Sequence, residues 1–435
     1  MQAIAPLAEA ERGAAAPPAP AMVVLTPAGL DATLLLPDDP LLLQSLSQCM
    51  KGWTVSAQRL AVGARPEPPP IIAIEPRGEG LYRAHSRFMD DPLDGLPLAA
   101  AICAILADLS QAVSDAGSDH GLGLHCAGVV LGARGVILAG ERRAGKSTLV
   151  ARLSAESDAL ILGDDVLPLC DDATMLGLGL APRLRLPLPA AAGFAFRTHV
   201  AQSLGPADDR YGYLLTPALQ PLGTRARAEA FILLDRRPGV SAALHRLSED
   251  RLLRALIDRS IAGPQGADAV YHCARALASR LLGLRLVYSD LEEAVQLLRT
   301  AFPRDGRPVA EATDLQPDLP DPENETGIAQ PVPINMPLKR RPGTTTRRIA
   351  DAAFLWHPEQ EMIWHLNPVA QLIWTMLSRP ATADSLASRL NRVFPDQPLE
   401  RLLADTCLLL GRMQAEGLVI GRAAKKATDP AGKSD

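Results

Sequence analysis

The chain has 435 residues, of which 47% are hydrophobic and 21% are charged, and its formal net charge is −5. This length allows two or three domains with sizeable cores, and the slightly acidic balance indicates neither a nucleic-acid nor an anionic-membrane partner. The six cysteines include no C-x-x-C pair, which argues against a zinc site and a disulfide framework; the reducing cytoplasm is therefore the expected location.

The N-terminal third predicts a tail and a small folded unit. Residues 1–20 are rich in alanine and proline and lack the basic start and apolar stretch of a signal peptide. Residues 21–118 hold short apolar runs between turn-forming segments, which predicts an N-terminal α/β subdomain ending in a helix from about Leu98 to Val113. The most apolar stretch, Leu96 to Leu109, contains a proline and an aspartate and is too short to span a bilayer, so we expect no membrane contact.

A glycine-rich motif follows a short apolar run at 135–139, which predicts a buried strand. Gly140, Gly145, Lys146 and Ser147 have the spacing G-x-x-x-x-G-K-[ST], and a helical pattern of apolar residues comes directly after them. Such a loop points its amide groups at a phosphate, with the lysine near the β/γ-phosphates and the serine on Mg²⁺. The sequence therefore predicts a nucleotide site in the loop residues Gly140, Glu141, Arg142, Arg143, Ala144, Gly145, Lys146, Ser147 and Thr148.

Two acids, Asp164 and Asp165, end the next apolar run, 159–163. A strand so soon after the loop and helix predicts a tight βαβ unit that sets both carboxylates beside the phosphates. One carboxylate can bind Mg²⁺ and the other can take a proton from an attacking hydroxyl; the alternative is a solvated loop or helix cap. Cys126, next to His125, is a candidate nucleophile, although a small core residue is the preferred interpretation.

His125 and the segments GERRAGKS (140–147) and LGDD (162–165) resemble the catalytic core of HPr kinase/phosphorylase and its relatives. The fold of those enzymes is similar to that of phosphoenolpyruvate carboxykinase, and they use ATP to phosphorylate a serine of a protein. The resemblance covers residues 120–190 well and the rest of the first 300 weakly. It implies an α/β P-loop kinase core over residues 119–302, with ATP and Mg²⁺ as cofactors.

The same resemblance implies roles for individual residues. Asp164 would be the general base, Asp165 and Ser147 would hold magnesium, Lys146 would stabilise charge, and His125 would lie near the transferred phosphate. The sequence departs from the family at Arg142 and Arg143, which replace small loop residues, and at 180–186, which lacks the acid and glycine-rich signature of the bifunctional enzymes. The second departure argues against phosphorylase activity.

Arginines dominate the basic residues of the stretch 170–300, which continues the α/β pattern, and a guanidinium suits a phosphate. Our first choice for a phosphate clamp is Arg185, because it follows soon after the paired acids. The arginines considered are Arg183, Arg185, Arg210, Arg236 and Arg246. Residues 303–340 are rich in proline and acids and predict a semi-extended linker.

Residues 341–425 predict a small winged-helix-like α+β domain, followed by a tail at 426–435. Apolar runs at 353–356 and 362–366 flank a polar loop and predict a hairpin. Asn367 is a suitable cap for a helix with proline at its first position, and two further helices are expected to start at Thr382 and Leu399.

This domain resembles the PqqD-like family in three features: the expected hairpin, the segment N-P-x-A-x-x-I-W, and a helix that ends in E-G-L-V-I. Members of that family bind the leader peptides of ribosomally made, modified peptides (RiPPs). The resemblance implies a precursor-peptide partner, and other enzymes of the pathway as further partners. The alternative is a winged-helix DNA binder, to which the basic stretch 339–341 points; the mixed charge of the third helix argues against it, so we expect no nucleic acid. The expected peptide-binding residues are Met362, Ile363, Trp364, His365 and Leu366.

The preferred interpretation is an ATP-dependent Ser/Thr kinase acting on a precursor peptide that the C-terminal domain docks, with the linker raising the local concentration of the peptide. The first alternative is a non-catalytic escort that uses nucleotide to gate peptide delivery to another enzyme, and the two arginines in the loop favour it. The second alternative is a regulatory kinase of a carrier protein, which the peptide-binding domain makes less favoured.

Overall fold

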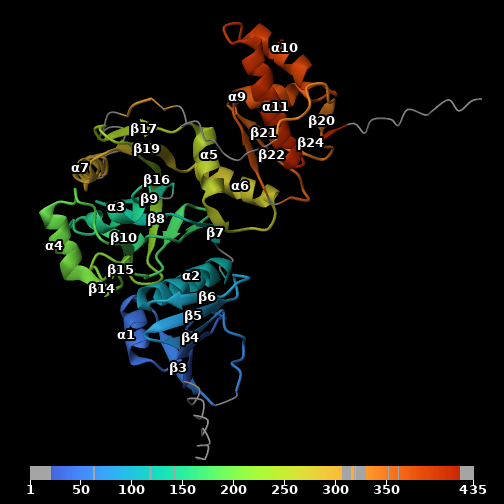
Figure 1. Ribbon diagram of the computed structural model, residues 1–435. Coiled ribbons are helices and arrows are strands. Elements are labelled where there is room, and N and C mark those ends of the chain that lie inside the picture. The colour runs from blue at the N-terminus through green and yellow to red at the C-terminus, as the bar shows by residue number, and fades with distance from the viewer. Residues whose placement is uncertain are drawn as a thin grey trace, which may run out of the picture.

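The computed structural model describes residues 21–61, 64–116, 120–141, 143–305, 315–317, 319, 330–350, 352–360 and 362–421. The expected tails at 1–20 and 426–435 and the loop residue Arg142 lie outside the described residues. The chain is mixed α/β with several sheets and a C-terminal α+β domain, as expected. An N-terminal part, a central part and a C-terminal part follow one another along the long axis of the molecule (Figure 1).

The N-terminal part is a six-stranded sheet in the order β3-β1-β2-β4-β5-β6 with two helices. Alternating burial along β4, where Ile72 and Ile74 are buried, gives the sheet one apolar face. Asp39 caps α1, because its side chain accepts from the backbone N–H groups of Leu41 and Leu42. The elements are β1 (Met22–Pro27), β2 (Leu34–Pro37), α1 (Pro40–Gln48), β3 (Val55–Leu60), β4 (Ile72–Gly78), β5 (Leu81–Ser86), β6 (Leu93–Leu96) and α2 (Leu98–Ala116).

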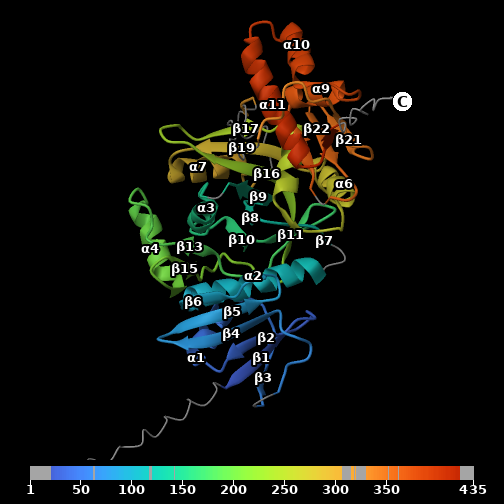
Figure 2. The ribbon, with the colours of Figure 1, turned by 45° about the vertical axis from the view of Figure 1, so that its right-hand side comes forward.

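Helix α2 confirms the helix expected from about Leu98 and joins the N-terminal part to the central part. By length and composition it is the one helix in the described part of the chain that could cross a membrane. Of its most apolar window, 56% is buried inside the protein. It packs against β5 of the N-terminal sheet on one side and against strands of the central part on the other (Figure 2), which is the setting of a core helix.

The central part is built on a ten-stranded sheet in which β9, β16 and β19 run parallel, with Gly140 of β9 opposite Leu234 of β16. Beyond this trio the sheet is antiparallel on both sides. A smaller sheet, in the order β13-β15-β14, packs beside it. The strands are β7 (His120–Leu124), β8 (Ala127–Leu131), β9 (Arg134–Gly140), β10 (Ala159–Gly163), β11 (Leu167–Cys170), β12 (Thr174–Leu176), β13 (Arg183–Arg185), β14 (Leu204–Ala207), β15 (Tyr211–Leu214), β16 (Arg225–Arg236), β17 (Ala243–Arg246), β18 (Ser260–Ala262) and β19 (Leu282–Tyr288).

The order of strands β9, β8 and β10 in the sheet decides where the glycine loop and the paired acids lie. The expected tight βαβ unit is loosened by one strand, because β8 lies between β9 and β10 and is antiparallel to both. Strands β9 and β10 therefore point the same way, and the glycine loop and the paired acids still meet at one edge of the sheet. The helices of the central part are α3 (Lys146–Leu153), α4 (Phe194–Ser203), α5 (Glu249–Asp258), α6 (Ala267–Ala278) and α7 (Leu291–Ala301).

The C-terminal domain confirms the expected hairpin as β22 and β23, and adds a strand, β21, on the other side of β22. The second hairpin strand starts at Trp364, two residues later than expected. Asn367 caps α9 and Thr382 caps α10, both through their side chains, as the sequence predicts. The elements are β20 (Leu338–Arg340), β21 (Thr345–Ile349), β22 (Ala352–Trp356), β23 (Trp364–Leu366), α9 (Pro368–Met376), α10 (Ala383–Val393), α11 (Leu399–Ala415) and β24 (Val419–Gly421).

Parts of the stretch predicted as a linker pack onto folded elements. Val332 is buried in the C-terminal core, and β20 pairs with β24. Gln316 exchanges backbone hydrogen bonds with Leu244 and Arg246 at β17. The described residues of this stretch therefore contact folded elements both of the central part and of the C-terminal domain.

Candidate functional site

The glycine loop connects the last residue of β9, Gly140, to the first residue of α3, Lys146. Gly145 has a φ of 93°, a left-handed conformation that suits glycine. A Cβ at Gly145 would also lie 2.7 Å from the hydroxyl of Tyr288. Strand, loop and helix therefore follow one another directly, and the N-terminus of α3, which favours anions, lies at the end of the loop.

Tyr288, at the end of β19, holds this loop in place. Its hydroxyl donates a hydrogen bond of 2.8 Å to the backbone carbonyl of Ala144, and the side chain is 2% exposed. Burial raises the pKa of this phenol to about 12, so it remains a donor at neutral pH. The sequence analysis did not identify Tyr288, because no motif links residues so far apart in the chain.

Lys146 and the paired acids form the charged centre of the site. The lysine Nζ lies 3.6 Å from Oδ1 of Asp164 and 4.0 Å from Oδ1 of Asp165, and it also donates to the backbone carbonyl of Asp164. The Asp164 side chain is 6% exposed, whereas that of Asp165 is 58% exposed. One acid is therefore shielded from water and the other is open to it.

Burial raises the pKa of the Asp164 carboxyl, with a further contribution from the charge of Asp165, against the opposing effects of Lys146 and of the Ser147 hydroxyl. Its Oδ1 atom is buried and accepts no hydrogen bond, so it is able to take a proton or a hydrogen bond from a ligand. His125 follows β7, with its Nδ1 3.6 Å from Oδ1 of Asp165. Burial lowers the pKa of His125, which favours a neutral ring at pH 7.

Ser147, Asp164 and Asp165 supply the oxygens that a magnesium ion prefers. No group of three or more His, Cys, Asp or Glu side chains able to hold a metal occurs among the described residues. Magnesium is commonly held by one or two carboxylates together with substrate phosphates. The residues present therefore fit Mg²⁺ bound with a nucleotide better than a metal bound by the protein alone.

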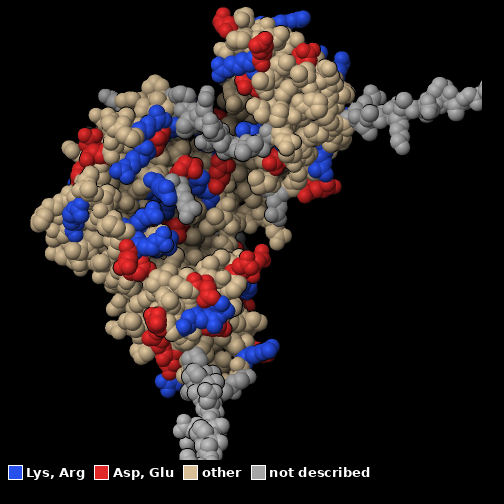
Figure 3. All heavy atoms as spheres, in the orientation of Figure 1, with Lys and Arg blue, Asp and Glu red and all other residues tan. Residues whose placement is uncertain are grey.

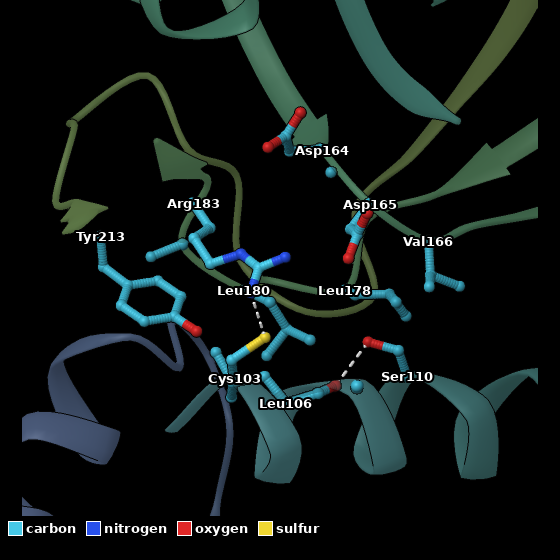
Figure 4. A pocket seen from close by; sticks show the side chains of 13 residues that line it. Cys103, Leu106, Ser110, Asp164, Asp165, Val166, Leu178, Leu180, Arg183 and Tyr213 are labelled. Atoms are coloured by element: carbon cyan, nitrogen blue, oxygen red, sulfur yellow. Dashed lines mark hydrogen bonds between the residues drawn. The ribbon is translucent and has the colours of Figure 1, made fainter. Parts of the chain in front are cut away.

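One small pocket lies at the paired acids and another lies beside the glycine loop. The first, which we call the acid pocket, has a volume of about 60 Å³ and contains Asp164, Asp165 and Arg183 (Figure 4). The second, the loop pocket, has a volume of about 50 Å³ and is lined by Gly145, Thr148, Arg236, Tyr288, Asp290 and neighbouring residues. Arg185, our first choice among the arginines, is exposed and lines neither of them, whereas Arg183 and Arg236 each line one.

Arg259, which the sequence analysis did not consider, also contacts the glycine loop. It is the C-cap of α5, and its guanidinium lies 2.7 Å from a carboxylate oxygen of Glu141. Its backbone carbonyl accepts a hydrogen bond from the N–H of His125. Arg143, in the loop itself, is exposed and has a φ of 74°. Lys and Arg side chains also gather on the visible face of the central part, over β17, α3 and β10 (Figure 3).

Cys126 is a core residue, as the preferred interpretation held. It is fully buried, and burial raises the pKa of its thiol to about 12. A thiolate is the nucleophilic form of cysteine, and it is scarcely populated at such a pKa. The hypothesis of a cysteine nucleophile beside His125 is therefore wrong.

The five expected peptide-binding residues have different environments. Met362 is 59% exposed, Ile363 packs on the central part, and Leu366 is buried in the C-terminal core. His365 Nε2 lies 3.3 Å from a carboxylate oxygen of Asp250 on α5. Trp364 packs on the C-terminal core, and its indole N–H is buried without a hydrogen-bond partner. Strand β23, which carries the last three of these residues, is an edge of its sheet.

The C-terminal sheet is covered on both faces. Ala353 and Leu355 face the domain's own helices, whereas Phe354 and Trp356 face the central part. The ring of Tyr271 on α6 lies 4.7 Å from that of Trp356 and 5.8 Å from that of Phe354, measured between centroids. The sheet therefore joins two hydrophobic cores.

The basic stretch at 339–341, which kept a DNA-binding alternative open, is engaged within the domain. The Arg340 guanidinium lies 4.8 Å from the ring centroid of Trp374 and donates to the backbone carbonyl of the same residue. Arg341 pairs with Glu359 at 2.6 Å. Two of the three basic side chains are therefore committed to contacts inside the domain.

In the comparison with known proteins, a family match is found for the C-terminal domain. No curated protein matches the chain, and no family match supports the kinase resemblance of residues 119–302. Residues 353–419 match the family described as Coenzyme PQQ synthesis protein D (PqqD). This match runs from β22 to β24 and includes β23 and all three helices. The C-terminal domain is thus a PqqD-like domain, in agreement with the resemblance to RiPP recognition elements.

Proposed function

We propose that this protein is an ATP-dependent kinase of the HPr kinase type, which phosphorylates a serine or threonine hydroxyl of a ribosomally made precursor peptide held by its PqqD-like domain. The observation that carries the proposal is the grouping of Lys146, Asp164 and Asp165 at the N-terminus of α3, next to the glycine loop. A buried acid with a raised pKa beside a lysine and a helix N-terminus is a site built for proton transfer next to a phosphate.

Each residue of this group has a separate task. The loop amides and Lys146 would bind the phosphates of ATP, which would supply the phosphoryl group, and Ser147 and Asp165 would hold Mg²⁺. Asp164 takes the proton of the acceptor hydroxyl, a step that its raised pKa favours. His125, neutral and close to Asp165, is in reach of the same region. Tyr288 keeps the loop in its binding conformation.

The peptide is held at β23 by strand addition. An edge strand presents unpaired N–H and C=O groups to an extended chain. The indole N–H of Trp364 is buried next to that edge without a partner, so it becomes a further donor only when peptide binding moves the side chains that cover it. Exposed apolar side chains that flank the strand, Met362, Val369 and Leu372, provide surface for apolar residues of the peptide. The PqqD family match over these residues supports a peptide-binding role in RiPP biosynthesis, with other enzymes of the pathway as further partners.

The alternative function is a nucleotide-gated escort that binds the peptide without modifying it. The exposed Arg143, in a left-handed conformation within the loop, favours this alternative, because arginines there replace the small residues of active kinases. Full-length protein incubated with ATP, Mg²⁺ and candidate precursor peptides distinguishes the two functions. Peptide mass spectrometry would show added phosphate on Ser or Thr for the kinase, and bound but unmodified peptide for the escort.

A further inference from the structure

The acid pocket reaches the paired acids from the side of the N-terminal part. Its floor is the helix α2, which contributes Cys103, Leu106, Ala107 and Ser110 (Figure 4). The acids and Arg183 complete it, and no residue of the glycine loop lines it. An occupant of this pocket would therefore meet Asp164 from a different direction than a nucleotide bound at the loop.

Arg183 enters this pocket with much of its hydrogen-bonding capacity unused. One guanidinium nitrogen donates to the sulfur of Cys103, and the guanidinium stacks 4.8 Å from the ring centroid of Tyr211. In the part of the chain that the structure describes, no carboxylate lies within ion-pair distance of Arg183, although the charge of Asp165 acts on it at longer range. A thiol is a weak acceptor, whereas a guanidinium binds carboxylate or phosphate oxygens with two donors at once.

The size and lining of the acid pocket limit what can enter it. A volume of about 60 Å³ is enough for a few waters or for one small polar group of a larger ligand. The walls are mostly apolar, from Leu106, Val166, Leu178 and Leu180. Among such walls an anion is held strongly by a single arginine, because the effective dielectric constant is low.

We propose that the acid pocket is the acceptor subsite, and that Arg183 binds an anionic oxygen, of a carboxylate or a phosphate, which the acceptor carries beside its reactive hydroxyl. This inference rests on the proposed function and adds the chemical class of the substrate: a small aliphatic hydroxyl next to an anionic group. Arg183 neutralises that anion, which the nearby Asp164 and Asp165 would otherwise repel. The N-terminal part contributes to the proposed subsite, because α2 forms the floor of the acid pocket.

The first experiment measures anion binding without turnover. Full-length protein carrying Lys146→Ala, which weakens phosphate binding at the loop, is alkylated with iodoacetamide in the presence of acetate or inorganic phosphate. Peptide mass spectrometry follows Cys103, and the reference is the same protein in chloride at the same pH and ionic strength. We expect either anion to slow alkylation of Cys103 several-fold relative to chloride.

The variants decide whether Arg183 is responsible. Arg183→Gln should abolish the protection, and Arg183→Lys should keep part of it. Arg185→Gln, an exposed arginine two residues along the same strand, should leave it intact. Protection of Cys103 that survives Arg183→Gln, or the absence of protection at high anion concentration, would overturn the proposal.

The second experiment uses a precursor peptide that the protein phosphorylates, and it measures steady-state kinetics. Arg183→Gln should raise KM for the peptide by roughly 10-fold or more, the usual effect of losing a charge-assisted hydrogen bond, with KM for ATP unchanged. An equal rise in both KM values would contradict an acceptor role. Because the alkylation experiment needs no phosphate transfer, anion protection without any kinase activity would reject the proposed function and keep the anion site.

Discussion

The glycine loop and β23, the proposed sites of chemistry and of peptide docking, use buried and exposed polar groups in opposite ways. At the loop, Asp164 is enclosed and its pKa is raised, and its neighbour Lys146 is held by several polar contacts. At β23 the backbone groups of an edge strand face outward, while the sheet behind them is buried on both sides. A site for chemistry thus needs groups whose charge the protein controls, whereas a site for docking needs a rigid support and unpaired groups at its rim.

One helix contacts both regions. Near the first turn of α5, Asp250 pairs with His365 of the docking strand, and at its C-cap Arg259 pairs with Glu141 of the loop. The two sites are therefore fixed relative to each other by ten residues of helix. The loop depends on the charge of buried groups and β23 on its open backbone edge, so a substitution in one region should leave the function of the other unchanged.

The largest effect is expected for Lys146→Ala. Without the ammonium group, the loop amides alone balance the β/γ charge, so ATP affinity should fall by about 10-fold or more and transfer should become undetectable. Isothermal titration with ATP and a peptide phosphorylation assay measure the two quantities. Peptide binding should stay unchanged, and normal turnover in a folded variant would reject the assignment of the nucleotide site.

Asp164→Asn should keep ATP binding and reduce transfer by about 10²–10⁴-fold, because the general base is lost. Asp165→Asn is the matched control: it should mainly raise the Mg²⁺ concentration required for transfer. In the wild type, transfer should increase as pH rises through the raised pKa of Asp164. If both substitutions change only the magnesium dependence, Asp164 is not the base.

The same carboxyl predicts a pH dependence of stability. A folded-state pKa above the unfolded value of 3.8 means that the folded state binds more protons, so Asp164 lowers stability as pH rises through that window. Asp164→Asn removes this contribution. The melting temperature of the variant relative to the wild type should therefore increase as pH rises above the unfolded value of 3.8. A difference that is constant with pH would show that the carboxyl does not titrate in this way.

Trp356→Ala should reduce stability by about 3–5 kcal/mol, the range for removing a buried tryptophan side chain, because this ring fills the contact between the C-terminal sheet and α6. Denaturant unfolding measures the change. Nucleotide affinity should be unaffected under conditions in which the variant is folded. An unchanged stability would mean that the two parts are held together mainly by other contacts.

The smallest effect is expected for Trp364→Phe, which keeps an aromatic ring and removes the indole N–H. Leader-peptide affinity should fall by about 2–10-fold, the effect of one hydrogen bond, and ATP affinity should not change. The measurement belongs on the full-length protein, because a fragment from 341 onward would expose Phe354 and Trp356. Tight binding by Trp364→Phe would mean that the buried N–H atom has no role in docking.

The sequence predicted those features that depend on local patterns. The strand and helix around Gly140 to Lys146, the hairpin and the Asn367 cap all depend on residues close together in the chain, and each is found. Contacts between distant segments could not be predicted in this way. Tyr288 on Ala144, Arg259 on Glu141 and the α2 floor of the acid pocket join residues more than fifty positions apart, and no periodicity encodes them.

Local sequence patterns also fail to distinguish Arg185 from Arg183, although these two residues are close together in the chain. The two arginines lie on one strand of three residues, with Leu184 between them buried. Both arginines follow the paired acids in sequence, so sequence distance gives no reason to prefer Arg185; in the structure Arg183 lines the acid pocket and Arg185 is exposed. Which arginine faces the acids depends on how β13 packs on α3 and α2, and this is decided by tertiary structure.

The double burial of the C-terminal sheet has a consequence for how such proteins diversify. Phe354 and Trp356 attach the domain to the central part, whereas the outer edge of β23 and the exposed side chains beside it remain free to vary. Attachment and recognition are therefore assigned to different positions of one small sheet. If β23 docks a leader peptide as proposed, substitutions along its edge and at the start of α9 change specificity without disturbing the attachment face of Phe354 and Trp356.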